Sequence, residues 1–189
     1  MNHVQRPRAV ASPVRIGLAL LIAVTALMLI QPPAPAPAAS GGLGTAQPSS
    51  KKGGKFKKAK LVKGRAIPPE TAPKRIKKAI RAANKIRKTK YVYGGGHGSF
   101  KSKGYDCSGA VSYMLHGGKM LKTPMTSGSL ASSWGKRGKG KWLTVYANGG
   151  HTYAVIAGLR WDTSGGPGPR WHKDMRSSSG FAKRNYKGL

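Results

Sequence analysis

The chain has 189 residues and a mass of 20.0 kDa, which leaves room for one folded domain. Lys and Arg number 35 against 4 Asp and Glu, so the formal net charge is +31, and 39% of the residues are hydrophobic, enough for a modest core. The single cysteine, Cys107, excludes an internal disulfide framework and a multi-cysteine metal site, and the scarcity of carboxylates excludes an acidic calcium loop.

The N-terminus is typical of an export signal. Basic residues precede an uncharged apolar run over residues 16–30, and Ala36-Pro37-Ala38 follows as a cleavage sequence. The apolar run is shorter than the roughly 20 residues that a membrane-spanning helix needs. We therefore expect residues 1–38 to be a signal peptide and the mature protein to be secreted into the cell envelope. A retained N-terminal anchor is the competing interpretation, and it is the one route by which we expect membrane contact.

Residues 39–68 are rich in Gly, Ser, Pro and Lys and contain few apolar side chains. Such a composition does not bury enough surface to offset the entropy of ordering the chain. We expect residues 39–68 to be a disordered basic linker and residues 69–189 to form the folded domain.

The first expected helix runs from about Thr71 to Lys88. Thr71 is a suitable N-cap, and a proline is tolerated in the first turn. Four apolar residues at helical spacing form one stripe, and the other faces are Lys and Arg: the stripe is Ile76, Ile80, Ala83 and Ile86. The basic faces favour a solvated helix surface, and a dedicated binding helix is the alternative.

A second helix is expected from Asp106, which is a good N-cap, to Gly117-Gly118, which ends it. Loop-rich residues 119–140 follow. Strands are expected over 141–147, 151–157 and 160–163, with Asn148-Gly149 as a hairpin turn, and Gly-, Ser- and Pro-rich residues 164–189 close the chain. The fold class is therefore α+β, with N-terminal helices packed on an antiparallel sheet.

Cys107 is the first candidate for chemistry. It lies at the start of the second expected helix, where free backbone N–H groups and the helix dipole stabilise an anion such as a thiolate. Its own backbone N–H is a candidate donor to an oxyanion. An idle exposed thiol is a liability outside the cytosol, which favours a catalytic role, whereas a packed core cysteine after an ordinary N-cap is the plainer interpretation.

A thiol nucleophile needs a base, and His151 is the histidine that opens an expected central strand. In a hairpin with a two- or four-residue loop, paired positions sum to an odd number. Because 151 and 162 have an odd sum, Asp162 is expected on the face of His151, opposite or diagonal to it. A three-residue loop would turn it away, which leaves a lone structural histidine and a surface aspartate as the alternative.

The sequence resembles the NlpC family of papain-like peptidoglycan endopeptidases. The resemblance covers roughly residues 72–165 and rests on Tyr91-Val-Tyr-Gly-Gly, on Asp106-Cys-Ser-Gly-Ala-Val-Ser-Tyr and on Gly150-His151 at the start of a strand. Asp162 departs from the His, Asn or Gln usual in the family. Tyr93 replaces a usual Trp, and residues 138–143 replace a usual Pro-Gly-Asp-Leu turn.

The resemblance implies a papain-like NlpC-type fold and a thiol protease that cleaves peptide bonds in peptidoglycan stem peptides, next to D-glutamate. It implies Cys107 as nucleophile, His151 as base and Asp162 in the third polar position. Tyr91, Asp106 and Ser108 would lie near the substrate peptide. Neither a metal nor a cofactor is implied.

Two other classes of function stay open. One is a basic cell-wall protein that keeps the fold, binds anionic polymers and has no catalytic activity. The other is a secreted nucleic-acid binder, since a lysine-rich chain binds polyanions by counterion release. Aromatic residues are absent from 57–90, so the basic region offers bases no stacking platform, and we expect no specific nucleic-acid partner.

Overall fold

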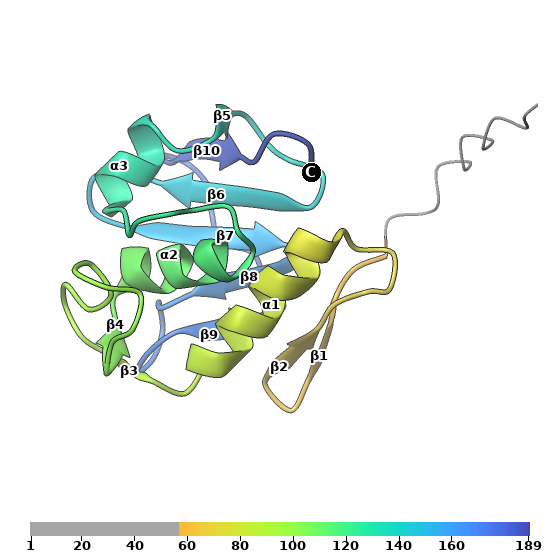
Figure 1. Cartoon of the computed structure of the whole chain (residues 1–189), viewed down its shortest axis with the longest axis horizontal. Helices are drawn as coiled ribbons and strands as arrows, with labels where there is room; N and C mark the ends of the chain where they lie inside the picture. The colour runs from red at the N-terminus through yellow and green to blue at the C-terminus, as the bar shows by residue number, and fades with distance from the viewer. Residues whose placement is uncertain (1–56) are drawn as a thin grey trace, which may run out of the picture. The chain divides into compact units, whose positions relative to one another are not determined.

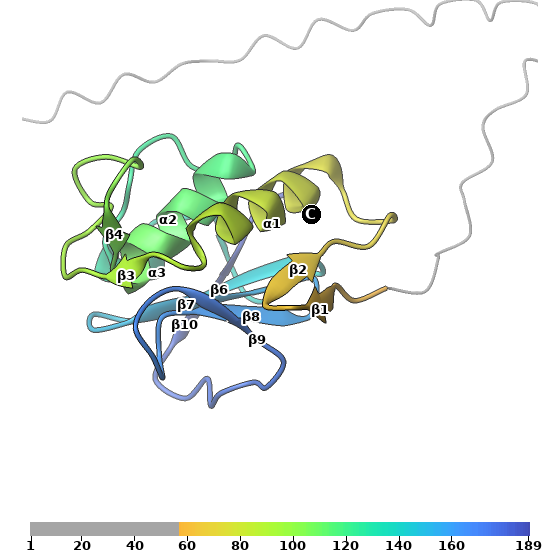
Figure 2. The same cartoon turned by 90° about the horizontal axis from the view of Figure 1, so that it is seen from below.

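The computed structural model describes residues 57–189, so the expected signal peptide and residues 39–56 of the expected linker lie outside the described residues. The helices pack on one side of an antiparallel sheet, as expected for the α+β class (Figures 1 and 2). The helices are α1 (Lys74–Ile86), α2 (Cys107–Gly117) and α3 (Ser127–Ser132).

The main sheet has six strands in the order β5-β10-β6-β7-β8-β9, and every neighbouring pair is antiparallel. Its strands are β5 (Lys136–Arg137), β6 (Leu143–Ala147), β7 (Thr152–Ile156), β8 (Leu159–Asp162), β9 (Arg170–His172) and β10 (Ala182–Asn185). Two small sheets accompany it, a parallel pair β3 (Lys90–Tyr91) and β4 (Gly104–Tyr105), and a hairpin of β1 (Lys60–Val62) and β2 (Arg65–Ile67).

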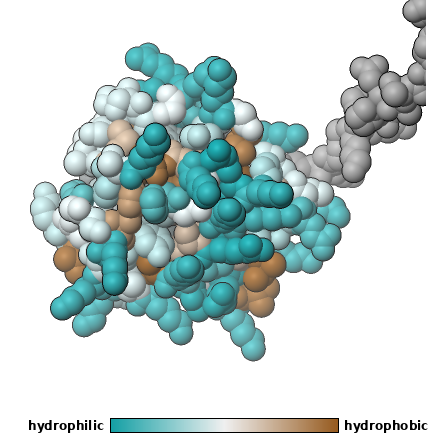
Figure 3. All heavy atoms as spheres, in the orientation of Figure 1, coloured by the Kyte–Doolittle hydropathy of each residue, from teal (hydrophilic) through white to brown (hydrophobic). Residues whose placement is uncertain are grey.

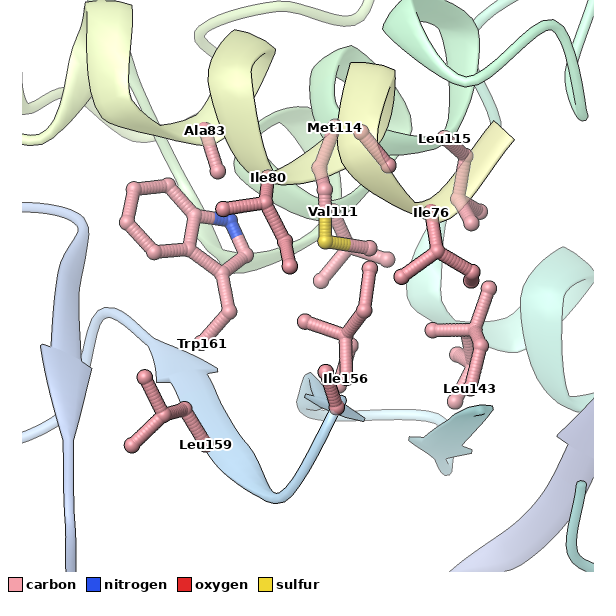
Figure 4. Packing of buried hydrophobic residues seen from close by; sticks show 14 of the residues in the cluster. Ile76, Ile80, Ala83, Val111, Met114, Leu115, Leu143, Ile156, Leu159 and Trp161 are labelled. Atoms are coloured by element: carbon pink, nitrogen blue, oxygen red, sulfur yellow. The ribbon is translucent and has the colours of Figure 1, made fainter. Parts of the chain in front are cut away.

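The core lies between the helices and the sheet. The expected stripe on α1 is confirmed, since all four of its apolar residues are buried. Figure 4 shows Ile76 and Ile80 of α1 and Met114 of α2 directed toward Ile156 and Trp161 of the sheet. The Trp161 side chain is fully buried and donates its Nε1 hydrogen to the carbonyl of Ala110 at 3.1 Å. This bond ties β8 to the first turn of α2.

Helix α1 begins later than the sequence analysis expected. Its N-cap is Pro73, with ψ of 149° and no side-chain cap hydrogen bond, so the expectation that Thr71 caps the helix is wrong. The physical reason is steric, because a residue that precedes proline is driven out of the α region. Ala72 therefore cannot be helical, and the first helical residue lies beyond Pro73.

The expected disordered linker is wrong over its last part. Residues 60–67 form the β1–β2 hairpin, which turns at Lys63 (φ 46°) and Gly64 (φ 71°). Ala66 is fully buried, and its N–H and carbonyl both bond the side-chain amide of Asn84 in α1, at 3.0 and 2.8 Å. The Lys- and Gly-rich composition conceals this hairpin, because its docking partner lies in a different element.

The C-terminal segment also contains more structure than its composition indicates. Residues 164–189 were expected to close the chain as loop, but β9 and β10 both belong to the main sheet. Strand β10 pairs with β6 on one side and β5 on the other, and only Arg184 within it is buried. The Arg184 side chain donates to the carbonyls of Ala131 and Ser132. Such a strand carries no apolar alternation that a sequence pattern could reveal.

Candidate active site

Cys107 opens α2, as expected, and Asp106 is the N-cap. The Asp106 Oδ1 atom accepts the Gly109 N–H at 2.7 Å, which occupies one of the free donors of the first helical turn. Cys107 is 9% exposed and makes no disulfide. The thiol is therefore held at a helix N-terminus, where the helix dipole favours a negative charge on sulfur.

His151 lies immediately before β7, one residue outside the strand that was expected to contain it. The Asn148 side chain fixes this position, because its Oδ1 atom accepts the His151 N–H at 2.9 Å and the Gly150 N–H at 3.0 Å. The imidazole is thus supported by the β6–β7 turn. The two strands that this turn joins, β6 and β7, pair over their full lengths.

The expected strand parity is confirmed. Ala154 pairs with Trp161 across β7 and β8, and the strands are joined by a two-residue turn at Ala157 (φ 47°) and Gly158 (φ 81°). Asp162 is therefore diagonal to His151 on the same face. The His151 Nε2 atom lies 2.9 Å from Asp162 Oδ1.

Hydrogen bonds to Asp162 and, second, to Cys107 raise the pKa of His151 to about 9, and burial opposes the rise only in part. The three candidate catalytic residues are thus brought together. Since Nε2 faces Asp162, Nδ1 is the ring nitrogen that is left for the thiol. An imidazole with this pKa carries a proton at neutral pH.

Asp162 is completely buried and surrounded by donors. Its Oδ1 atom also accepts the Ser164 N–H at 3.1 Å and the Ser164 hydroxyl at 3.0 Å. Its Oδ2 atom lies 3.2 Å from Arg176 NH1 and 3.6 Å from Arg160 Nε. Burial by itself would raise the pKa of this carboxyl, but the hydrogen bonds from His151 and Ser164 outweigh it and hold the pKa well below its usual range. The carboxylate is therefore a permanent anion beside the imidazole.

Arg176 is a site residue that the sequence analysis missed. Its NH1 group donates to Asp162 Oδ2 and, at 2.7 Å, to the Ser164 hydroxyl. The guanidinium lies over the rings of Tyr153 and Phe181, at 5.3 and 5.5 Å from their centroids. It belongs to the segment between β9 and β10, and no local motif marks it. Its side chain braces the buried carboxylate.

Asp106 and Ser108, expected near the substrate, point into the protein and are 4% and 2% exposed. The Asp106 Oδ2 atom lies 2.8 Å from His97 Nε2 and accepts the Gly94 N–H at 3.2 Å. The Ser108 hydroxyl lies 3.0 Å from Asp106 Oδ1 and 2.7 Å from the same His97 nitrogen. These contacts tie residues 94–98, which we call the glycine-rich loop, to the first turn of α2. His97, which no motif singled out, is the partly exposed member of the cluster.

The glycines of the two motifs are explained by the same loop. A Cβ atom on Gly109 would overlap the carbonyl oxygen of Gly95, and one on Gly95 would overlap the carbonyl oxygen of Gly104. The Gly95 carbonyl also accepts the Asp106 N–H at 3.2 Å. The loop and the helix start therefore approach as closely as backbone allows, which places the loop beside Cys107.

Tyr91, the third residue expected near substrate, ends β3 and is 45% exposed. Burial raises the pKa of Tyr91, and the charges of Cys107 and Asp106 raise it further. The Tyr91 phenol is therefore close enough to Cys107 for the charge on sulfur to affect it, while its ring is open to solvent. Of the three residues expected to contact substrate, it is the one whose side chain is accessible.

Within residues 57–189, no group of three His, Cys, Asp or Glu side chains is arranged to hold a metal ion. In the same part of the chain, no helix is both long and apolar enough to cross a membrane.

The sequence matches no protein-family model and no curated protein. Among solved structures, the chain is similar to the peptidoglycan hydrolase RipB from Mycobacterium tuberculosis, with 23% identity, a TM-score of 0.48, and coverage of 62% of this chain and 68% of that one. It is also similar to a variant of the Resuscitation Promoting Factor Interacting protein RipA, with 20% identity, a TM-score of 0.46, and coverage of 69% and 71%.

Proposed function

We propose that the protein is a secreted cell-wall hydrolase, a cysteine peptidase that cleaves peptide bonds in peptidoglycan stem peptides. The observation that carries the proposal is the grouping of a helix-start thiol, an imidazole and a buried carboxylate: Cys107, His151 and Asp162. The NlpC-like sequence motifs and the likeness to a peptidoglycan hydrolase support the substrate class.

The reaction is acyl transfer to sulfur. His151 holds the proton of Cys107, and the resulting thiolate attacks the carbonyl carbon of the substrate amide to form a C–S bond. Backbone N–H groups at the start of α2 donate to the oxyanion. The C–N bond breaks as His151 gives its proton to the leaving amine, and water then hydrolyses the thioester with His151 as base. No step calls for a metal or cofactor.

Asp162 and the groups that donate to it keep the imidazole in the orientation that these reaction steps need. The carboxylate fixes Nε2, which leaves Nδ1 available to the thiol, and it stabilises the imidazolium while the thiolate is present. Tyr91 is the proposed contact to the substrate peptide. Asp106 and Ser108 hold the glycine-rich loop in place from inside the protein. His97 is the most exposed member of this cluster.

The test is digestion of purified sacculi and of a soluble stem peptide, with products identified by mass spectrometry. We expect Cys107→Ala and His151→Ala to abolish cleavage and to keep the wild-type circular dichroism spectrum. His116→Ala, at an exposed position near the end of α2, is the matched histidine control and should cleave the soluble stem peptide normally. Full activity of Cys107→Ala would reject the peptidase.

Comparison of the wild type with Cys107→Ala also distinguishes the peptidase from the two other classes of function. A non-catalytic wall-binding protein would pull down with sacculi and release no peptide in any form, wild type included. A nucleic-acid binder would prefer DNA or RNA over sacculi. Rapid alkylation of Cys107 at neutral pH, lost in a denatured sample, would support an activated thiol rather than a packed core cysteine.

Export is the proposed route to this substrate. N-terminal sequencing of protein recovered from the medium or the envelope should find a mature start after Ala38. Recovery of the intact N-terminus in a membrane fraction would instead support the retained anchor.

A further inference from the structure

The exposed side of α1 carries a continuous row of cations. Its members are separated by steps of 4, 3 and 4 residues, which places them on one face of the helix: Lys74, Lys78, Arg81 and Lys85, all exposed. At a rise of about 1.5 Å per residue the row extends for about 16 Å. We call it the α1 cationic row. Figure 3 shows hydrophilic side chains gathered over the part of the surface where α1 lies.

Within residues 57–189, no Asp or Glu side chain, Glu70 included, forms an ion pair with a member of this row. Three of the four acids serve other contacts, with Asp106 bound to His97, Asp162 to His151, and Asp174 to Arg160. The first turn of α1 contains no acid either. Like charges three and four residues apart destabilise a helix, and cations near its N-terminus oppose the helix dipole. The arrangement costs stability unless an anion outside the chain occupies the row.

A hollow adjoins the C-terminal end of the row. It has a volume of about 530 Å³, and Lys85 of the row lines it together with Lys101 and the rings of Phe100 and Tyr113. The row therefore runs into a concave space whose lining includes two lysines, rather than ending on a convex surface. A linear polyanion that followed α1 would meet this hollow with its next anionic group.

We propose that the α1 cationic row and the adjoining hollow bind a linear, phosphate-bearing polymer of the cell wall. The proposal rests on the proposed function for the compartment and for the choice of polymer. Binding itself uses none of the candidate catalytic residues. Its role would be to retain the enzyme where its peptide substrate is concentrated.

The test uses the full chain with Cys107→Ala, so that no cleavage takes place during binding, and glycerol-phosphate polymer as the probe. The row variant combines Lys78→Gln with Arg81→Gln. The matched control combines Lys139→Gln with Lys141→Gln, which removes the same charge from an exposed loop. The N-terminal basic segment is identical in all forms. Dissociation constants are measured between 50 and 200 mM salt.

The expected result is a shallower salt dependence for the row variant. Each phosphate contact contributes roughly 0.7 to the slope of log affinity against log salt, so the loss of two contacts lowers it by about 1.4. Over the fourfold salt range, the row variant should lose about sevenfold less affinity than the parent, by the same relation. The control should keep the parental slope.

Two results of the binding measurements would overturn the proposal. Equal slopes for the row variant and the control would mean that diffuse charge, not the row, binds the polymer. Tighter binding to duplex DNA than to the glycerol-phosphate polymer would assign the row to nucleic acid. Neither outcome affects the cleavage of a soluble stem peptide by the protein with Cys107 intact. Polymer binding by the row can therefore be rejected while the proposed peptidase activity stands, and the reverse.

Thermal unfolding tests whether the row variant is still folded. Because the row variant removes like-charge pairs, we expect its midpoint of thermal unfolding without polymer to be equal to or higher than that of the parent. Addition of polymer should raise the midpoint of the parent and the control more than that of the row variant. Equal polymer-induced shifts in all three forms would contradict the proposal.

Discussion

Replacing Asp162 with Asn removes one buried charge from the candidate site and changes its shape very little. The amide oxygen can still accept from Ser164, but the negative charge that faces His151, Arg176 and Arg160 disappears. The variant therefore isolates the electrostatic part of the Asp162 contribution from its steric part.

The main effect is expected on the protonation of His151. Its pKa is about 9 against an ordinary value of 6.5, and the hydrogen bond that His151 makes to Asp162 is the largest cause, followed by the one to Cys107. The whole difference corresponds to about 3 kcal/mol in favour of the imidazolium. Without the carboxylate, burial and the two nearby guanidinium groups act against the proton. We expect the pKa of His151 in the variant to fall toward 6.5.

The pH dependence of stability follows from the direction of each shift. The raised pKa of His151 stabilises the fold below pH 6.5, and this contribution is lost as the pH rises toward 9. The lowered pKa of Asp162 stabilises the fold above its ordinary value of 3.8 and is lost as the pH falls below it. The wild type should therefore exceed Asp162→Asn in unfolding free energy most between about pH 4 and 6.5.

The assay is a titration of the histidine ring protons by nuclear magnetic resonance, with His151 assigned from its absence in His151→Gln. Chemical denaturation at pH 6 and at pH 9.5 gives the matching stabilities. Asp174→Asn is the control, because this acid is largely exposed and contacts Arg160 rather than His151. A midpoint that stays near 9 in Asp162→Asn would refute the reasoning.

Three further outcomes are expected. Asp162→Ala should slow peptide cleavage by roughly 10²–10⁴-fold, less than Cys107→Ala does, as measured by turnover of a stem peptide. Arg176→Gln should shift the pH profile of Cys107 alkylation, and Arg176→Lys should restore it in part; identical profiles would leave the bracing role unsupported. Ile80→Ala should lower the unfolding free energy by about 2–5 kcal/mol in urea titrations, because the residue is fully buried.

Much of the site follows from local signals in the sequence. The N-cap preference of aspartate locates the start of α2 and with it Cys107. The period of two in a strand, joined to a two-residue turn, places Asp162 on the face of His151. Both inferences depend only on neighbours in the chain. For the same reason the apolar stripe of α1 could be predicted. The start of that helix was misplaced because the preference for threonine as an N-cap favoured Thr71, whereas Pro73 keeps the residue before it out of the helix.

The parts that could not be predicted depend on partners that are distant in sequence. Arg176 becomes a site residue only because the chain returns past Asp162 after β9, and β10 becomes a strand only because β6 offers it an edge. Asp106 and Ser108 look available in the motif but are occupied by His97 in the fold. Residue types alone do not reveal which polar groups pair with one another inside the fold.

The hairpin at residues 60–67 changes what a truncation of the basic N-terminal segment is expected to do. Its cations suggest a dispensable targeting segment, but Ala66 is buried against Asn84 through two hydrogen bonds, and the Ala59 N–H donates to the Ala157 carbonyl at 2.8 Å. Removal of the hairpin exposes the apolar surface beneath it and leaves polar groups that have lost their partners.

We therefore expect two truncations to behave differently. A protein that starts at Lys57 should keep the unfolding free energy and stem-peptide activity of the mature form, and its sacculus binding should be weaker and less salt-sensitive, because exposed charges are screened beyond about 8 Å at physiological ionic strength. A protein that starts at Pro69 should in addition lose about 1–3 kcal/mol of unfolding free energy, since buried donors and acceptors lose their partners. Urea titration, stem-peptide cleavage and sacculus pull-down at low and high salt measure these effects. Equal stability of the two truncated forms would show that the hairpin is an appendage of the domain rather than part of it.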